Sequence, residues 1–329
     1  MRSMYLSIVL CACGSSSSPE TPGTEAPAAC TPTNNVIDLA TDHGWALWGM
    51  RADARGPWVL VEKKQNGLSD YVILDGTGEV ATLASGIPDS SGTRVEPVSF
   101  DGKRCVAMHT LNVTFSFACE GSAIETPPHE LGGDMRAVAT GTTLHVFGQQ
   151  FAAYHELRRD DGTWRQVEKF ESSISEAEDA ITTGGGFASC FLSTGGKASI
   201  DQGGSDFSYG TVAKWCRLIP GDTIGVLTDK GLSTFSGGAF TTPEPSALAA
   251  DRPVAVGRVA GQPVAVVRRG TNVELQPLPN GTPTVLRAAE SAENAHAAIL
   301  SDRIAVFGVK ALHDTATTRY QLIASTHCL

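Results

Sequence analysis

The sequence lacks the positive charge that a nucleic-acid-binding protein needs. Its 329 residues carry a formal net charge of −10, and no cluster of lysine and arginine exceeds two residues. Contacts to a phosphate backbone require a basic stripe, so this composition argues against nucleic acid as a partner. An acidic surface of this kind is ordinary for a soluble domain.

Catalytic and metal-binding motifs are also missing. No GxSxG, HExxH, phosphate-loop or GxGxxG motif occurs, and neither does a CxxC or HxH pair. The sequence therefore offers no recognisable nucleophile, phosphate cradle or zinc site. The turns at residues 160–164 and 229–235 come nearest to the Asp-box of bacterial sialidases, but both depart from its residue pattern. Beyond the N-terminus, no stretch approaches the roughly 20 apolar residues of a membrane helix.

The N-terminal segment has the layout of an export signal. Arg2 precedes a short apolar run at residues 4–10, which leads into Leu10-Cys11-Ala12-Cys13-Gly14. This stretch resembles the bacterial lipobox, in which a leucine stands three positions before a cysteine that becomes acylated. The resemblance implies a signal peptide at residues 1–12, a lipidated Cys13, and a membrane anchor in the cell envelope. Gly14 after that cysteine resembles lipoproteins sent to the outer membrane.

A polar segment follows the proposed lipid. Residues 15–29 are rich in serine, proline and threonine and contain no apolar side chain larger than alanine. Such a composition cannot bury a core and is typical of a flexible tether. We therefore divide the chain into a signal peptide (1–12), a lipidated tether (13–34) and a folded body (35–329).

A four-strand unit recurs through the body with a period of about 40 residues. Its clearest element is the second strand, a continuous apolar run bounded by tight turns. Continuous rather than alternating runs are expected in sheets that are buried on both faces. Seven such strands are found, at residues 58–61, 105–108, 144–147, 190–192, 224–227, 264–267 and 304–307.

The two ends of the body complement each other. The last unit lacks a fourth strand, whereas an extra strand at residues 35–40 precedes the first unit. Both facts are explained if the chain closes into a ring and the N-terminal strand completes the final sheet. We therefore predict an all-β, seven-bladed β-propeller, with six or eight blades as alternatives. A two-domain β-sandwich would explain the short strands but not the even period.

Six cysteines remain after the leader, and their even number in an exported chain favours disulfides. Cys105 and Cys119 lie on consecutive strands at equal distances from Asn112, so a regular hairpin places them opposite each other. Cys190 and Cys216 lie in neighbouring units. Cys30 and Cys328 flank the strands that would close the ring, where a bond would lock the seam.

A carboxylate stands just before, or at the start of, the innermost strand of most units. If functional, these side chains would ring one mouth of a central channel and attract a calcium ion or a basic partner segment. Aspartate also favours such turns for backbone reasons alone. The set is Asp42, Glu96, Asp134, Asp179, Asp251 and Glu293.

The histidines and tryptophans give no further site. His109 and His145 lie at non-equivalent places on second strands, so we expect satisfied strand residues rather than ligands. We expect Trp45, Trp48, Trp58 and Trp215 to pack between blades rather than to form a sugar platform.

The leading functional prediction is a binding or scaffold module, a lipid-anchored monomer of the cell envelope that presents its channel face to a protein, peptide or glycan. Two alternatives remain open at this point. One is a polysaccharide-active glycosidase or lyase, supported only by analogy with other propellers. The other is a structural component of an envelope-assembly machine.

Overall fold

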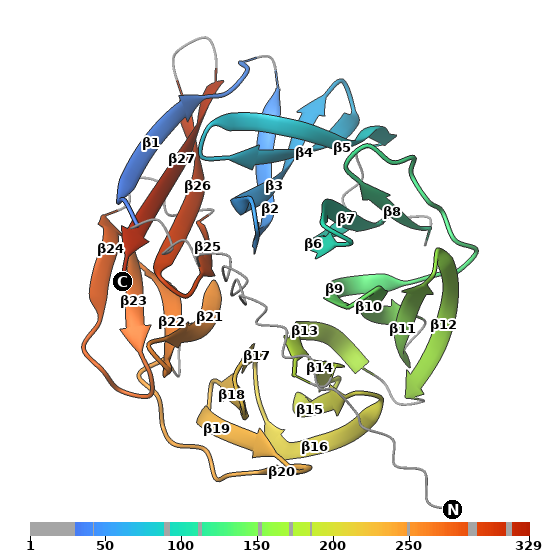
Figure 1. The fold of residues 1–329 in the computed structure, drawn as a ribbon, viewed down its shortest axis with the longest axis vertical. Coiled ribbons are helices and arrows are strands. Elements are labelled where there is room, and N and C mark those ends of the chain that lie inside the picture. The colour runs from blue at the N-terminus through green and yellow to red at the C-terminus, as the bar shows by residue number, and fades with distance from the viewer. Residues whose placement is uncertain are drawn as a thin grey trace, which may run out of the picture. The chain divides into compact units, whose positions relative to one another are not determined.

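Seven small antiparallel sheets make up the fold, and no described residue lies in a helix (Figure 1). The structure is a computed structural model. It describes residues 30–41, 43–88, 93–110, 114–150, 153–170, 174–184, 186–248, 251–288, 295–313 and 318–329. These segments contain no helix that is long and apolar enough to cross a membrane. The prediction of an all-β propeller with seven blades is confirmed.

The blades follow one another along the chain, each starting with its innermost strand. Blade 1 contains β2 (Gly44–Asp53), β3 (Gly56–Gln65), β4 (Leu68–Asp75) and β5 (Gly78–Pro88); blade 2 contains β6 (Arg94–Phe100), β7 (Lys103–His109) and β8 (Phe115–Cys119). Blade 3 contains β9 (Gly132–Thr140), β10 (Thr143–Gln150), β11 (Ala153–Asp160) and β12 (Thr163–Phe170); blade 4 contains β13 (Ile174–Thr183), β14 (Gly186–Ser193), β15 (Lys197–Gln202) and β16 (Ser205–Val212). Blade 5 contains β17 (Cys216–Ile219), β18 (Ile224–Thr228), β19 (Gly231–Ser236) and β20 (Ala239–Phe240); blade 6 contains β21 (Ala255–Val259), β22 (Gln262–Arg269), β23 (Asn272–Pro277) and β24 (Thr284–Ala288). Blade 7 contains β25 (His296–Ile299), β26 (Arg303–His313), β27 (Thr318–Cys328) and, from the other end of the chain, β1 (Thr33–Asp38).

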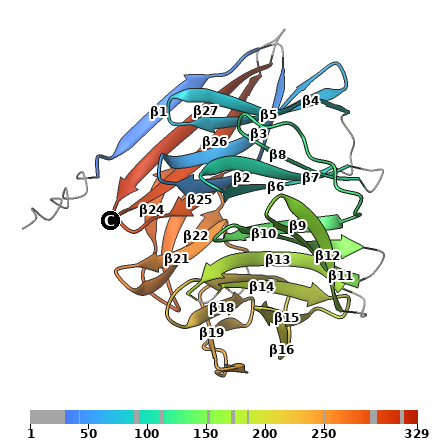
Figure 2. The same cartoon turned by 45° about the vertical axis from the view of Figure 1, so that its right-hand side comes forward.

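The ring closes through β1. This strand pairs antiparallel with β27, in a register that runs from Thr33 opposite Thr326 to Asp38 opposite Gln321. Both views show β1 lying along β27 at the outer edge of blade 7 (Figures 1 and 2). The innermost strands also contact one another in an unbroken circle, from β2 through β6, β9, β13, β17, β21 and β25 back to β2. The predicted closing strand is confirmed, beginning two residues earlier than expected.

Each second strand packs against two neighbouring blades at once. In β3, Val59 and Val61 join a cluster with residues of blade 7, whereas Trp58 and Leu60 join a cluster with residues of blade 2. Successive side chains of a strand point to opposite faces of its sheet, so burial of both faces requires every residue to be apolar. This explains why the second strands read as continuous apolar runs.

Two local features differ from the sequence-based expectation. Beyond the tether, the sequence favours a helix only weakly and only at residues 172–180, but the described part of this stretch lies in strand β13. Blade 2 has three strands instead of four, and its outer position is represented only by a bridge between Phe117 and Glu125. An innermost strand must complete the circle whatever its polarity, so ring closure overrides the local pattern.

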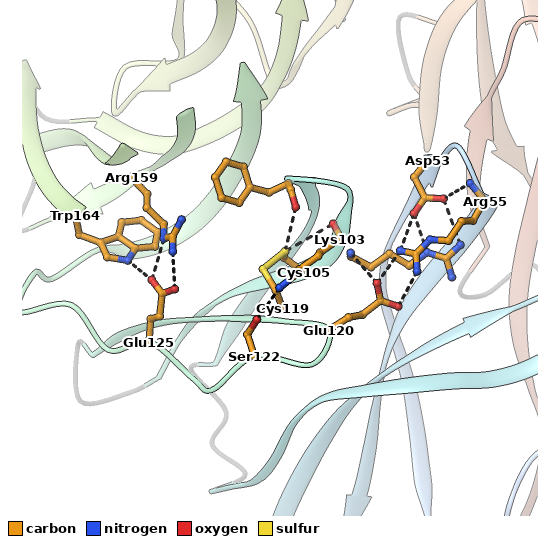
Figure 3. The surroundings of a disulfide bond; sticks show 12 residues. Asp53, Arg55, Lys103, Cys105, Cys119, Glu120, Ser122, Glu125, Arg159 and Trp164 are labelled. Carbon is orange, nitrogen blue, oxygen red and sulfur yellow. Dashed lines mark hydrogen bonds and ion pairs between the residues drawn. A yellow bond between two sulfur atoms is a disulfide. The ribbon is translucent and has the colours of Figure 1, made fainter. Parts of the chain in front are cut away.

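Ion pairs hold the three-stranded blade between its neighbours (Figure 3). On one side, Arg55 of blade 1 donates to Glu120 at 2.6 Å, and Arg104 of blade 2 donates to Asp53 at 2.8 Å. On the other side, Arg159 donates to both oxygens of Glu125, at 2.8 and 3.0 Å. Trp164 Nε1 adds a bond to Glu125 at 2.6 Å. The contacts of Glu120 and Glu125 lie on the segment that follows β8, whereas Arg104 belongs to the second strand β7.

All six cysteines from Cys30 onward are disulfide-bonded. Cys105 and Cys119 stand opposite each other in the β7–β8 register and are bonded, as predicted. The predicted bond between Cys190 of β14 and Cys216 of β17 is also confirmed, and it links blade 4 to blade 5. The bonding of Cys30 to Cys328, rather than to another cysteine, stays a prediction.

Replacement of Cys30 by serine should loosen the seam. A bond between Cys30 and Cys328 would close nearly the whole chain, which in the chain-entropy model is worth up to about 5 kcal/mol. We expect the unfolding temperature to fall by roughly 5–10 °C, with hydrogen exchange rising first in blades 7 and 1. Peptide mapping of the unreduced protein should recover the two cysteines in one linked species.

The matched control is Cys105→Ser with Cys119→Ser, which opens a loop of 14 residues inside one blade. Its effect should be smaller and confined to blade 2. Recovery of Cys30 in a linkage that excludes Cys328 would disprove the seam bond.

Candidate binding site on the innermost strands

The structure describes four of the six predicted carboxylates. Glu96, Asp134 and Asp179 lie on the innermost strands β6, β9 and β13, and Asp251 precedes β21. Asp42 and Glu293 lie outside the described residues. Glu96 and Asp134 lie near the start of their strands and Asp251 lies before its strand, as predicted, whereas Asp179 lies in the middle of β13.

None of these four carboxylates stands as an isolated negative charge. Glu96 pairs with Arg51 and lies 3.6 Å from Arg136. Asp134 and Asp251 accept from Arg94 at 3.0 Å and from Arg269 at 2.9 Å. Asp179 accepts from the backbone N–H groups of Ala180 and Leu218, at 2.9 and 2.8 Å.

A calcium ion would have to displace these bonds. No group of three metal-ligating side chains converges within the described part of the chain. The four carboxylates therefore form hydrogen bonds and ion pairs with neighbouring residues. They do not form the open ring of oxygen ligands that the sequence led us to expect.

Arginine is the partner that the sequence analysis missed. Each blade places at least one charged or titratable side chain on its innermost strand or just before it, and one from each blade can be followed around the ring. We call this set the inner belt. Its members, from blade 1 to blade 7, are Arg51, Glu96, Arg136, Glu178, Arg217, Arg252 and His296.

Bonds of the inner belt cross from blade to blade. Arg51 of blade 1 donates to Glu96 and, at 3.0 Å, to the carbonyl of Pro97 in blade 2. Arg136 of blade 3 donates through Nε to the carbonyl of Glu178 in blade 4 at 2.8 Å. Arg217 of blade 5 donates to the same carbonyl. The belt thus ties the innermost strands together where no backbone ladder connects them.

Glu178 is the point at which three blades meet. Its carboxylate is fully buried, and Oε2 accepts from Arg252 of blade 6 at 2.7 Å and from Arg217 at 3.3 Å. Burial of a carboxylate without compensation costs several kcal/mol, so these guanidinium groups are needed for it to remain ionised.

His296 is the belt's member in blade 7. It lies at the start of β25, opposite Phe307 of β26. Burial lowers its pKa to about 4, and the positive charges of Arg51 and Arg268 act in the same direction. The imidazole is therefore neutral at physiological pH.

His145, on the second strand of blade 3, forms a second polar cluster. Its Nε2 lies 2.8 Å from Thr140 Oγ1, and its Nδ1 lies 2.7 Å from Glu156 Oε1. A hydroxyl, an imidazole and a carboxylate in this order resemble a nucleophile relay. However, His145 is buried against Phe187, whose ring centroid is 4.4 Å away, and Arg158 also binds Glu156. The cluster satisfies a buried histidine, as predicted.

For His109 the prediction of a satisfied histidine is wrong. Both of its ring nitrogens are buried, and neither forms a hydrogen bond to any residue that the structure describes. Burial lowers the pKa of this histidine, with a further contribution from Arg94, so the ring stays neutral. Hydrogen-bond satisfaction of a strand residue depends on its neighbours across the sheet, which strand patterning does not reveal.

The tryptophans are used for packing. Trp45, Trp58 and Trp215 are buried, and the partly buried Trp48 donates to Glu62 at 3.1 Å. The expectation that they pack between blades is met, and none of these four rings offers an open platform for a sugar.

Protonation of His296 should reduce stability in mild acid. The unfolded imidazole binds a proton near pH 6.5, whereas the folded one binds it near pH 4. Between these values the unfolded chain holds more protons, so the free energy of unfolding falls as pH is lowered, by roughly 3 kcal/mol in all. Urea denaturation should show that His296→Gln lacks this component.

His313→Gln, at an exposed position of β26, serves as the control and should keep the wild-type pH dependence. Equal slopes for wild type and His296→Gln between pH 6.5 and 4 would contradict the assignment.

Comparison with known proteins supports the fold alone. No protein-family model matches the chain, and no curated protein matches it either. Among solved structures, the crystal structure of Raptor from Chaetomium thermophilum superposes with a TM-score of 0.53 at 11% sequence identity. The match covers 90% of this chain but only 29% of that one. The chain thus spans less than a third of this neighbour's length, and the likeness is one of architecture.

Proposed function

We propose that the protein is a binding or scaffold module of the cell envelope, anchored through acylated Cys13, that engages a protein, peptide or glycan at the inner belt. The observation that carries this proposal is the belt itself. Charged side chains from successive blades are gathered at the innermost strands, and Arg51 and Arg252 remain more than one-third exposed.

The belt offers a partner more than one point of attachment. Its side chains come from different blades, so a ligand that bridges two of them contacts two rigid sheets instead of one mobile loop. Sites built on packed strands hold their geometry better than sites on loops, which lowers the entropy cost of binding.

The disulfides and the leader support the envelope location. Disulfides persist in oxidising compartments and are rare in the cytosol, and this chain has oxidised cysteines both within a blade and between blades. The lipobox-like leader explains how such a chain would reach that compartment and stay there.

An enzyme acting on polysaccharide is less well supported. Glycoside hydrolysis needs two carboxylates that face each other across the substrate with different proton affinities. In the described part of the belt, Glu96 and Glu178 are each tied to arginine. The nucleophile-like cluster at His145 is buried. Neither arrangement presents a free acid–base pair.

Replacement of Cys13 by serine should release the protein from membranes. Several acyl chains give stable anchoring, whereas loss of the acylated cysteine leaves no comparable anchor. We expect the wild type in the detergent phase and Cys13→Ser in the aqueous phase after phase separation. Cys11→Ser is the control and should remain in the detergent phase. Membrane retention of Cys13→Ser would disprove lipid anchoring at this site.

Neutralisation of one exposed belt residue should weaken partner binding. Arg51→Gln removes a charge from the belt, whereas Arg165→Gln removes one from the outermost strand β12. Loss of one charge-assisted contact typically costs 1.5–3 kcal/mol, or about tenfold or more in affinity. Quantitative co-purification from solubilised envelopes should show partners lost from Arg51→Gln but kept by Arg165→Gln. Identical partner sets would locate binding away from the belt.

A further inference from the structure

Three guanidinium groups converge on Glu178, and they come from three different blades. Arg136 donates to its carbonyl oxygen, Arg252 to its carboxylate, and Arg217 to both. We call Arg136, Arg217 and Arg252 the arginine cluster. Burial raises the pKa of the Glu178 carboxyl, and the charges of Arg252, Arg217 and Arg136 oppose that rise.

Nearby carboxylates do not balance the charge evenly. Asp179, the next residue, accepts from backbone N–H groups and keeps its negative charge, and Glu96 is bonded to Arg51 and lies 3.6 Å from Arg136. Arg217 and Arg252 share the carboxylate of Glu178. Arg51 and the three arginines of the cluster thus stand beside three carboxylates, those of Glu96, Glu178 and Asp179, which leaves one more positive than negative charge.

The pKa values follow the same asymmetry. Burial lowers the pKa of both Arg136 and Arg217. Around Arg136 the charges of Glu96 and Asp179 outweigh burial, and its pKa is raised. Around Arg217 burial has the largest effect; the charge of Asp179 opposes it, the repulsion from Arg136 and Arg252 adds to it, and the pKa falls to about 10. An added negative charge beside Arg217 would relieve this repulsion.

Arg217 and Arg252 keep N–H donors that are not used in hydrogen bonds to residues that the structure describes. Within the described residues, Nε and Nη2 of Arg217 and Nε and Nη1 of Arg252 make no hydrogen bond to protein. The two side chains are 16% and 43% exposed, so both can be reached from solvent. A guanidinium presents its N–H groups as a planar fork that matches the two oxygens of a carboxylate.

We propose that the arginine cluster binds a carboxylate group of an acidic peptide segment, bridging Arg217 and Arg252. This proposal deepens the proposed function and rests on it for the existence of a partner. A peptide is favoured over an acidic sugar because sugar recognition typically uses an exposed aromatic face, whereas Trp45, Trp58 and Trp215 are buried. Trp48 is partly buried and bonded to Glu62.

The test measures binding of a fluorescent hexaglutamate peptide to the full-length chain by anisotropy. About 0.15 M salt shortens the Debye length to roughly 8 Å, which screens the net charge of −10 but leaves close contacts. Wild type should bind hexaglutamate and not hexaglutamine. Arg252→Gln should weaken binding about tenfold or more, because it removes a charge-assisted contact.

Arg252 is the residue to change because it lies on no strand and is the most exposed member of the cluster. Arg165→Gln, an exposed arginine paired with Asp160, is the matched control and should bind as wild type does. Should Arg252→Gln not fold, Arg252→Lys keeps the charge but loses the fork, and it should still weaken binding.

Several results would overturn the proposal. Equal affinities for Arg252→Gln and Arg165→Gln would do so, as would binding of hexaglutamine. Displacement of the peptide by inorganic phosphate at the concentration at which free glutamate acts would indicate a general anion site. Displacement by glucuronate but not by glutamate would assign the site to an acidic sugar.

Failure of this inference can be told apart from failure of the proposed function. If Arg51→Gln loses envelope partners but hexaglutamate does not bind, the module stands and the carboxylate assignment falls. If hexaglutamate binds as expected but Arg51→Gln loses no partner, the arginine cluster stands and the wider belt does not serve as the interface.

Discussion

Antiparallel pairing between β1 and β27 is the constraint on which the rest of the molecule depends. A sheet with an open edge exposes unpaired N–H and C=O groups that invite pairing with another chain. Here the final blade is built from both ends of the body, so its outermost strand is held by residues far away in sequence. With that strand in place, every blade has a neighbour on either side, and the innermost strands form a full circle.

Closure also determines where charge can be placed. Second strands such as β3 are sandwiched between two blades and must be apolar throughout. The innermost strands have one side toward the centre of the ring, so they can carry arginine and glutamate. Buried ion pairs seldom add net stability, because desolvation offsets the attraction. Their retention here at blade boundaries is consistent with a role in fixing neighbouring strands, and the exposed ends of Arg51 and Arg252 leave room for a ligand.

Much of the fold could be predicted from the sequence, because a strand that is buried on both faces appears as a continuous apolar run. The run 58–61 is apolar for that reason, and the extra N-terminal strand was recognisable because the last unit was one strand short. The Cys105–Cys119 bond followed from hairpin symmetry, since the register of β7 and β8 places the two cysteines opposite each other.

The candidate site was less predictable. Attention to carboxylates found Glu96 and Asp179 but not Arg136, Glu178 or Arg217, which occupy different offsets within their units. Bulges in β13 shift its side chains relative to β14, so equivalent positions in the blades do not align in sequence. A partner across a blade boundary is set by the angle between two sheets, and no periodicity within one strand records that angle.

Because blade 7 contains strands from both ends of the body, it cannot be completed until the last strand has emerged. Asp38 of β1 and Gln321 of β27, which are hydrogen-bonded, stand 283 positions apart. A chain that emerges from its N-terminus onward, at the ribosome or across a membrane, presents the earlier strand long before its partner. During that interval the hairpins of blades 1 to 6 can form from neighbouring residues, while β1 has nothing to pair with. A polypeptide that ended before β27 would leave β26 at an exposed edge of blade 7 and β1 without a partner strand. Exposed strands of this kind are open to proteases and chaperones. The outer edge of blade 7 is therefore covered only once β27 is present to pair with β1.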